Sequence, residues 1–351
     1  MKKNSFSQPL YFSGLRNPAR WIILMSVFIA GVAAGFGADR FVSSRRSAQI
    51  AYPVRETGSS TYKFIDPLLT FEIPESDAGS ALVSLKLAIG ASVAEHIRNH
   101  DADHVSVYVR TLKSGRWISV NPDERYSPAS LLKVPTMIAF YKLAESDPEI
   151  LSKRVQYAGG FNDNKAEHFK PARVIEPGMS YTIDELIHTM IAYSDNNATR
   201  LLHDNINPVL LEKVYNDLGV SISDAGTQDD FMTVNQYTYF FRVLYNATYL
   251  NRVLSEKAIA LLSEPDFPQG IQAGVPGTIA LAQKFGERSI ADAHGVISAR
   301  ELHDCGIVYY PQHPYLLCVM TRGNDFDKLA SMIRAISYLV YQDRDRQSRK
   351  Q

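Results

Sequence analysis

The sequence has few cysteines and no excess of either charge. Its 351 residues include two cysteines, 37 Lys or Arg residues and 37 Asp or Glu residues. Two cysteines exclude a disulfide-rich scaffold and cannot by themselves form a zinc site. The balanced charge excludes an overall basic protein that binds nucleic acid through its phosphates. The nine histidines follow no zinc spacing, so we expect no metal site. We also expect no cofactor, and the balanced charge predicts no nucleic-acid partner.

The zero net charge conceals an uneven distribution. Residues 1–46 contain seven Lys or Arg residues and one Asp, a net charge of +6, which leaves −6 for residues 47–351. Within the basic end, residues 21–38 form an uncharged run of 18 residues, long enough to cross a bilayer as a helix. We predict a membrane anchor there behind a cytoplasmic tail at 1–20, in preference to a cleaved signal peptide, whose apolar core is usually shorter. Either interpretation exports the remainder of the chain.

The rest of the chain predicts a tether followed by one folded domain. Residues 39–78 contain Pro, Gly, Ser and Thr without clear periodicity, and residues 343–351 are charges and amides expected to form a disordered tail. Between them, residues 79–342 carry apolar residues at helical spacing and short alternating runs. The predicted helices are 81–98, 130–144, 183–193, 198–203, 208–218, 234–247, 255–262 and 326–341, and the predicted strands are 104–112, 116–120, 279–285, 304–310 and 315–321.

The order of these elements indicates an α+β fold. Strands occur near both ends of the domain and helices fill its middle, without the alternation that predicts a doubly wound parallel sheet. We therefore predict a five-stranded antiparallel sheet built from both chain ends and flanked by helices, with an inserted all-helical lobe. A crevice between the sheet and the lobe would be the natural place for a ligand.

The two cysteines fall on the last two predicted strands. With Tyr310 placed opposite Tyr315, Cys305 and Cys318 become diagonal neighbours on one face of the sheet. A diagonal pair is poorly placed for a disulfide, so we expect two buried thiols. An oxidising compartment would still permit a disulfide.

A serine and a lysine three residues apart begin a predicted helix. Ser130 and Lys133 share one face of that helix. A serine hydroxyl becomes a nucleophile when a nearby amine accepts its proton, and burial or other cations can lower the pKa of that amine. The N–H groups at a helix start also favour an oxyanion. Alone the pattern is weak, because it recurs at Ser60 and Lys63 in the predicted tether.

Two further motifs strengthen the pattern. Ser194-Asp195-Asn196 lies between two predicted helices, and Lys284-Phe285-Gly286 lies on a predicted strand. A second serine can relay a proton, an asparagine can hold a substrate amide, and a strand lysine can anchor a carboxylate. Taken singly, each motif has an ordinary structural explanation, such as a helix cap or a surface lysine.

In their order, spacing and context the three motifs resemble those of class A β-lactamases and related penicillin-recognising serine enzymes. Intervals of 64 and 90 residues separate Ser130, Ser194 and Lys284. The surrounding residues fit as well, including YSPASLLKVP, MIAYSDNNAT and the late strand HDCGIVYY. The resemblance covers about residues 80–341 and implies a β-lactamase-like fold.

The resemblance implies a role for each residue of the first two motifs. Ser130 would be the acylated nucleophile, and Lys133 would accept its proton. Ser194 would pass a proton to the leaving nitrogen, and Asn196 would hold both Lys133 and the side-chain amide of the substrate. Asp195 would be structural.

The strand motif departs from the family pattern. Lys284 would meet the substrate carboxylate, and the backbone N–H of Glu287 would complete an oxyanion hole with that of Ser130, beside Gly286. The family has Thr or Ser where this chain has Phe285, so a hydroxyl that could bind the carboxylate is missing. On a strand, Phe285 would point away from Lys284 and Gly286, so anchoring by Lys284 can survive.

A second departure concerns hydrolysis of the acyl ester. Class A enzymes carry a Glu-x-x-Leu-Asn loop whose glutamate activates the deacylating water, and residues 197–232 contain no such string. We expect none of the acids of this interval to be the base. Glu212 and Asp217 would be helix-surface residues, Asp204 and Asp224 turn residues, and Asp229 and Asp230 a helix cap. The acyl-enzyme should therefore form but hydrolyse slowly.

The sequence thus predicts a serine hydrolase that opens β-lactam rings through a Ser130 ester. The alternatives are a membrane-anchored D-Ala-D-Ala peptidase or penicillin-binding protein, and a sensor that binds β-lactam or peptidoglycan without hydrolysing it. The partners would be a β-lactam or a peptidoglycan stem peptide and the membrane. We expect a monomer in the bacterial cell membrane, with its domain outside the cytoplasm, or a secreted domain if residues 21–38 are removed.

Overall fold

The computed structural model describes residues 54–55, 62–70, 79–220, 230–265, 267–292 and 294–349. The predicted membrane anchor at 21–38 and most of the predicted tether lie outside these residues, so both stay predictions. Within the described residues, none of the helices combines the length and the apolar character needed to cross a bilayer.

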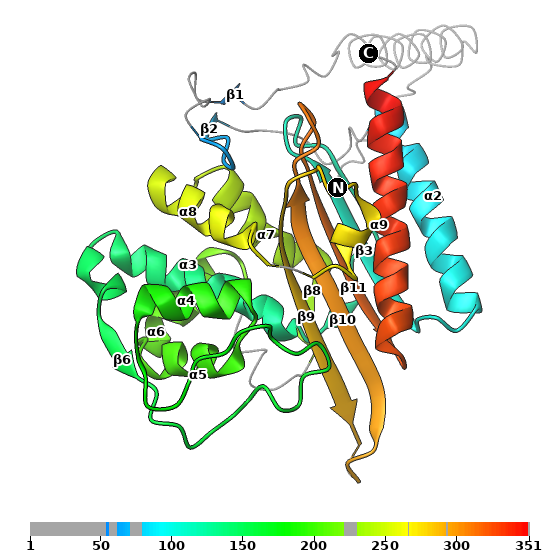
Figure 1. Cartoon of the computed structure of the whole chain (residues 1–351). Coiled ribbons are helices and arrows are strands. Elements are labelled where there is room, and N and C mark those ends of the chain that lie inside the picture. Colours follow the sequence, from blue (N-terminus) through cyan, green and yellow to red (C-terminus); the bar gives the residue numbers. More distant parts are fainter. Residues whose placement is uncertain are drawn as a thin grey trace, which may run out of the picture. The chain divides into compact units, whose positions relative to one another are not determined.

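An antiparallel sheet of five strands organises the domain (Figure 1). Its order is β4-β3-β11-β10-β9, so strands from both ends of the domain lie side by side and β9 is an edge strand. The strands are β3 (His104–Thr111), β4 (Trp117–Val120), β9 (Leu281–Ala291), β10 (Ile297–Val308) and β11 (Tyr315–Gly323). The predicted α+β fold with a five-stranded sheet is confirmed.

Two long helices pack together on one face of the sheet (Figure 1). They are α2 (Gly79–Arg98) and α9 (Phe326–Ser348), and Ile89 and Ile333 belong to the core beneath them. We predicted that the last helix ends at residue 341 and that residues 343–351 are disordered, but α9 continues to Ser348. The charged residues support the added turns, because Asp343 pairs with Arg346 at 2.7 Å one turn along the helix.

The inserted helical lobe covers the opposite face (Figure 1). Its core includes Phe140, Met190 and Phe241. The chain supplies clear start signals for two of its helices, since Thr182 and Thr233 both form capping boxes. The helices are α3 (Lys133–Ala144), α4 (Ile183–Ala192), α5 (Asn196–Asp204), α6 (Pro208–Asp217), α7 (Val234–Tyr245) and α8 (Arg252–Leu262).

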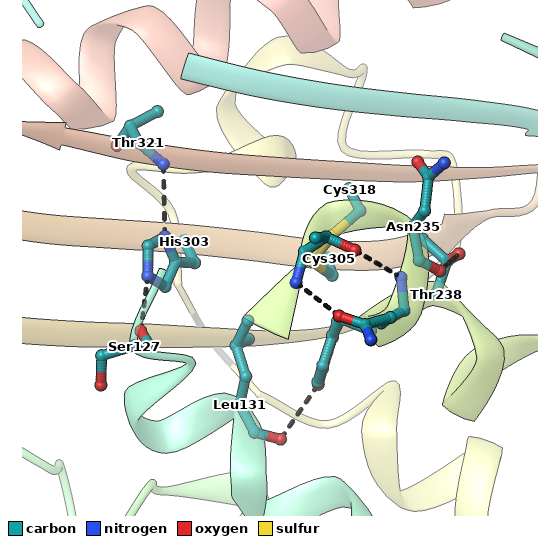
Figure 2. Close-up of a disulfide and its surroundings, with 11 residues drawn as sticks. Ser127, Leu131, Asn235, Thr238, His303, Cys305, Cys318 and Thr321 are labelled. Atoms are coloured by element: carbon teal, nitrogen blue, oxygen red, sulfur yellow. Dashed lines mark hydrogen bonds between the residues drawn. A yellow bond between two sulfur atoms is a disulfide. The ribbon is translucent and has the colours of Figure 1, made fainter. Parts of the chain in front are cut away.

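Cys305 and Cys318 form a disulfide between β10 and β11 (Figure 2). Val308, rather than Tyr310, is opposite Tyr315, which places the two cysteines directly across from each other. The predicted diagonal thiols were wrong because Tyr310 belongs to the turn: its carbonyl accepts the N–H of His313 at 3.0 Å. A two-residue shift of register converts a diagonal pair into a direct one.

We expect the disulfide to stabilise the domain substantially. Replacing both cysteines by alanine should lower the free energy of unfolding by about 2–3 kcal/mol, because the bond closes a short loop and restricts the unfolded chain. Denaturant titration of the two proteins measures the difference. Adding a reductant to the wild type removes the bond without changing a side chain and should give a loss of similar size. Unchanged stability in both comparisons would contradict the expectation.

Candidate active site

Ser130 lies where the helical lobe meets the edge of the sheet. It belongs to the short 3-10 helix η2 (Ala129–Leu132), which leads directly into α3. Ala129 has φ of 49°, a left-handed conformation that is uncommon for a residue other than glycine. This strained residue turns the chain sharply, so that half-buried Ser130 follows at the start of the helix. Strain of this kind often accompanies functional sites.

A buried histidine on β10 holds the segment that precedes Ser130 (Figure 2). The Nε2 atom of His303 donates to the carbonyl of Ser127 at 2.9 Å, and its Nδ1 atom accepts the N–H of Thr321 at 3.2 Å. Burial lowers the pKa of His303 to about 4, so the ring is neutral and its two nitrogens keep these different roles. The sheet thereby fixes the approach to the predicted nucleophile.

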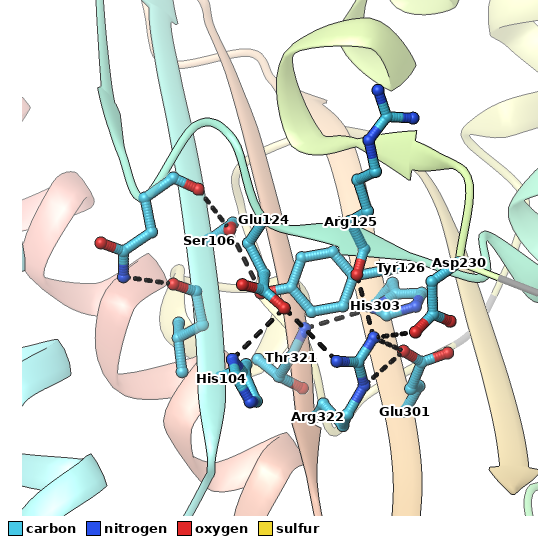
Figure 3. Close-up of polar contacts among 12 residues, drawn as sticks. His104, Ser106, Glu124, Arg125, Tyr126, Asp230, Glu301, His303, Thr321 and Arg322 are labelled. Carbon is cyan, nitrogen blue, oxygen red and sulfur yellow. Dashed lines mark hydrogen bonds and ion pairs between the residues drawn. The ribbon is translucent and has the colours of Figure 1, made fainter.

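A network of ion pairs around Arg322 on β11 also contacts the segment that precedes Ser130 (Figure 3). Arg322 on β11 contacts Asp230 at 2.6 Å and Glu301 at 2.9 Å, and its guanidinium lies over the ring of Tyr126 at 5.3 Å. Burial raises the pKa of Glu301 to about 7, although Arg322 acts against that rise. We expected Asp230 to cap a helix, which was wrong, because Thr233 caps α7 and Asp230 binds Arg322.

Lys133 makes three hydrogen bonds to the second motif. Its Nζ atom donates to the Ser194 carbonyl at 2.7 Å, to Ser194 Oγ at 3.0 Å and to Asn196 Oδ1 at 2.7 Å. Burial lowers the pKa of Lys133 to about 8, and the negative charge of Glu167 is the main influence opposing this fall. A fraction of Lys133 is therefore a neutral amine near pH 7 and can accept a proton.

The Ser194 hydroxyl is shared by two buried lysines. The Nζ atom of Lys284 on β9 donates to Ser194 Oγ at 3.0 Å, from the side of the sheet, while Lys133 donates from the lobe. Burial, followed by the charge of Lys133, lowers the pKa of Lys284. Ser194 itself has φ of 59°, which turns the chain between α4 and α5 and aims the hydroxyl at both amines. The three groups form a path along which a proton can pass.

Asp195 is structural, as expected. It is the N-cap of α5, and its carboxylate accepts the N–H of Asn197 at 2.8 Å. The other contacts of the carboxylate reach the long connection before α4, through Asn164 Nδ2 at 2.7 Å and the N–H of Ile175 at 2.8 Å. The central residue of the second motif therefore ties this connection to the site.

The third motif brings β9 against the backbone of the nucleophile. A Cβ atom on Gly286 would lie 2.9 Å from the carbonyl of Pro128 and 3.1 Å from the N–H nitrogen of Ser130. Only glycine allows this approach. Phe285 instead stacks on Phe267, with ring centroids 4.1 Å apart, in the second core of the domain. The role of the Glu287 N–H in an oxyanion hole stays a prediction.

Two acidic side chains at the site were missed from the sequence. Glu167 lies in the connection between β6 (Arg154–Gln156) and β7 (Ser180–Thr182), and its Oε1 atom accepts from Asn196 Nδ2 at 2.5 Å. The carboxylate of Glu287 accepts the N–H of His168 at 3.0 Å and that of Phe169 at 2.8 Å. Burial, with the nearby Glu167 adding to it, raises the pKa of Glu287 to about 7. No motif marks Glu167, which precedes the Ser-Asp-Asn triplet in the chain.

Between Asn196 and Thr233, three described acids lie on the surface, and the fourth, Asp230, pairs with Arg322. Asp204 and Glu212 are exposed on α5 and α6. Asp217 pairs with Lys213 at 2.7 Å, so its interpretation as a helix-surface residue is confirmed. Asp224 and Asp229 lie outside the described residues. Among the residues described, no group of three His, Cys, Asp or Glu side chains could hold a metal ion.

A cavity of about 360 Å³ lies next to the connection that carries Glu167. Its lining includes Tyr193 and Phe285, the chain neighbours of Ser194 and Lys284, together with His168, Phe169 and Phe267. Pockets of this size accept small molecules.

Gly286→Ala should strongly impair the reaction of Ser130 with a penicillin. The added Cβ must push β9 away from backbone atoms that cannot yield, and we expect a loss of about 100-fold in the acylation rate, the size of losing one well-placed backbone donor. Stopped-flow or quenched-flow acylation kinetics measure this rate. Gly277→Ala is the matched control, because a Cβ atom there meets nothing within 4 Å. Equal rates for both variants would contradict the proposed close approach.

Comparison with known proteins identifies the family. The model of the family described as "Beta-lactamase enzyme family" matches residues 88–343. A β-lactamase of Streptomyces fradiae is 28% identical over 107 residues, which are 30% of this chain and 34% of that protein. The chain therefore aligns with about a third of the length of this curated relative.

Solved structures share the fold. A mutant of PBP-A, in an acyl-enzyme complex with penicillin G, has a TM-score of 0.62 and 20% identity over 76% of this chain and 97% of its own. A β-lactamase from Sphaerobacter thermophilus has a TM-score of 0.59 and 22% identity over 73% and 95% of the two chains. An ancestral class A β-lactamase has a TM-score of 0.59 and 20% identity over 72% and 99%. The resemblance inferred from the three motifs is confirmed: this chain belongs to the β-lactamase enzyme family.

Proposed function

We propose that the chain is a serine hydrolase that opens β-lactam rings through an ester on Ser130. The observation that carries the proposal is the hydroxyl of Ser194 held between the amines of Lys133 and Lys284, at 3.0 Å from each. A structural lysine would be expected to keep its charge in water or beside a carboxylate. Two desolvated lysines that share one hydroxyl are costly, and such an arrangement is typical of catalytic sites.

These positions support the following reaction. Neutral Lys133 takes the proton of the Ser130 hydroxyl, and Oγ attacks the carbonyl carbon of the ring. The N–H groups of Ser130 and Glu287 would stabilise the oxyanion. The carbon–nitrogen bond then breaks, and the ring nitrogen receives a proton from Ser194, which regains one from Lys133. Water later hydrolyses the ester and restores Ser130.

Slow hydrolysis of the Ser130 ester would favour a second candidate, a penicillin-binding peptidase or a sensor. The Glu-x-x-Leu-Asn string of class A enzymes is absent between Asn196 and Thr233, and the described acids of that interval are exposed or paired with other side chains. A long-lived ester would suit a protein that is inhibited by penicillin or that reports its presence. The PBP-A neighbour was solved as an acyl-enzyme complex with penicillin G.

We also propose that the domain works outside the cytoplasm. The disulfide between Cys305 and Cys318 supports this location, because such bonds persist mainly in oxidising compartments. The uncharged run at residues 21–38 remains our prediction for how the chain reaches and holds the membrane. A stem peptide or a β-lactam would be met there.

The proposal is tested by intact mass spectrometry of the full chain mixed with benzylpenicillin. We expect an adduct of one penicillin that decays slowly, and no adduct on Ser130→Ala. Ser127→Ala, three residues earlier, is the control for a general effect of removing a serine. Rapid decay with turnover would identify an efficient β-lactamase and a permanent adduct would identify a penicillin-binding protein or sensor. A wild type that shows neither an adduct nor hydrolysis of the penicillin would refute the proposal.

The acylation rate should rise with pH and level off above about 8. Lys133 must be neutral to accept the Ser130 proton, and its pKa of about 8 means that the neutral fraction increases about tenfold per pH unit below that value. A penicillin methyl ester is the preferred substrate, since it has no carboxylate and so separates Lys133 from any change at Lys284. Lys133→Arg keeps the charge but cannot act as a base, and should lose the rise. A flat profile for the wild type would exclude Lys133 as the base.

A further inference from the structure

We propose that Glu167 makes the site selective for substrates whose acyl side chain carries an ammonium group. The inference rests on the proposed function and deepens it by naming a class of substrate. Glu167 lies in the connection between β6 and β7, which precedes the second motif in the chain. None of the three motifs includes this residue.

The contact between Glu167 and Asn196 places a carboxylate where the acyl group arrives. The Oε1 atom of Glu167 accepts from Asn196 Nδ2 at 2.5 Å, while Asn196 Oδ1 is occupied by Lys133 at 2.7 Å. Asn196 Nδ2 has two hydrogens, and it also donates to the carbonyl of Asp163 at 3.3 Å. Under the proposed function, one of these hydrogens binds the carbonyl of the substrate's side-chain amide. In either case the Glu167 carboxylate lies beside the first atoms of the acyl side chain.

A carboxylate at this place favours a positively charged group in the acyl side chain. An ammonium group one or two bonds from the amide carbonyl would lie within reach of Glu167. A hydrogen bond between two charged groups is stronger than one between neutral groups, and a substrate without the ammonium would not make it.

The segment that carries Glu167 is held on both sides. Before Glu167, the Asn164 side chain donates to Asp195 at 2.7 Å and accepts the N–H of Asn196 at 2.8 Å. After it, the N–H groups of His168 and Phe169 bind the carboxylate of Glu287 on β9. These contacts fix the backbone on each side of Glu167, so its carboxylate has a defined position rather than that of a freely moving surface side chain.

Aromatic packing adds to this attachment. The Phe169 ring meets that of Phe267 edge to face at 5.1 Å, and the His168 ring stacks on Phe326 at 4.8 Å. The connection thus spans the site from the helical lobe to the edge strand, with Glu167 between its two attachments. In Figure 1 it is the long green segment that passes in front of β9.

The charges of the site agree with this preference. Burial lowers the pKa of both Lys133 and Lys284, which weakens the attraction that an anion would find. Glu167 adds a carboxylate beside Asn196, and residues 47–351 carry a net charge of −6. In a partly buried site, attraction between an ammonium and a carboxylate is much stronger than in water.

Two penicillins that differ by one amine provide the test. Ampicillin has an α-ammonium group next to its amide carbonyl, and benzylpenicillin has hydrogen there. At a pH below 7, where that amine is protonated, we expect the full chain to be acylated by ampicillin roughly five- to tenfold faster, measured as the second-order rate constant for adduct formation. Glu167→Gln should bring the ratio of the two rates close to one.

The ratio separates selectivity from a general effect on the site. Any influence of Glu167 on Lys133 or Asn196 alters both rates alike and cancels. Glu176→Gln is the matched control, because it removes an exposed glutamate from the same connection and should keep the wild-type ratio. A wild-type ratio near one, or a preference that survives in Glu167→Gln, would overturn this inference while leaving the proposed function intact. The proposed function fails separately, if neither penicillin forms an adduct or is hydrolysed.

Discussion

The hydroxyl of Ser194, shared by the buried amines of Lys133 and Lys284, is the contact on which the rest of the site depends. Two ammonium groups cannot be brought together inside a protein without a fall in their pKa. Burying two amines together costs free energy. The two lysines meet where the helical lobe contacts the sheet, since one comes from the lobe and the other from the sheet. Any change in how the lobe lies on β9 would separate them.

Several buried contacts keep that boundary fixed. His303 holds the carbonyl of Ser127, and Gly286 lets β9 approach the backbone of Ser130 within van der Waals distance. Asp195 performs a similar task in the lobe, where it caps α5 and binds the connection that leads to Glu167. Lys133, Ser194 and Lys284 are in turn positioned by buried hydrogen bonds to one another. This is the support that a preorganised site requires.

The sequence was sufficient for the elements whose signals are local. The periodicity of residues 183–262 predicted the helices of the lobe, and the order and spacing of the three motifs predicted one site for Ser130, Lys133, Ser194 and Lys284. Features that depend on distant pairing were not accessible. The register of β10 and β11 depends on a turn at residues 310–313, and so the disulfide was missed. Glu167 reaches Asn196 only because its connection crosses from the lobe to β9, and no spacing in the sequence reveals such a path.

The central claim is that Ser130, and not the neighbouring Ser194, carries the acyl group. Peptide mapping of the penicillin-treated chain after trypsin digestion tests it most directly, because cleavage after Arg125, Lys133, Arg173 and Arg200 places the two serines on different peptides. Our account predicts the added mass on residues 126–133, with fragmentation assigning it to Ser130. An ester on residues 174–200, or no modified peptide at all, would contradict it.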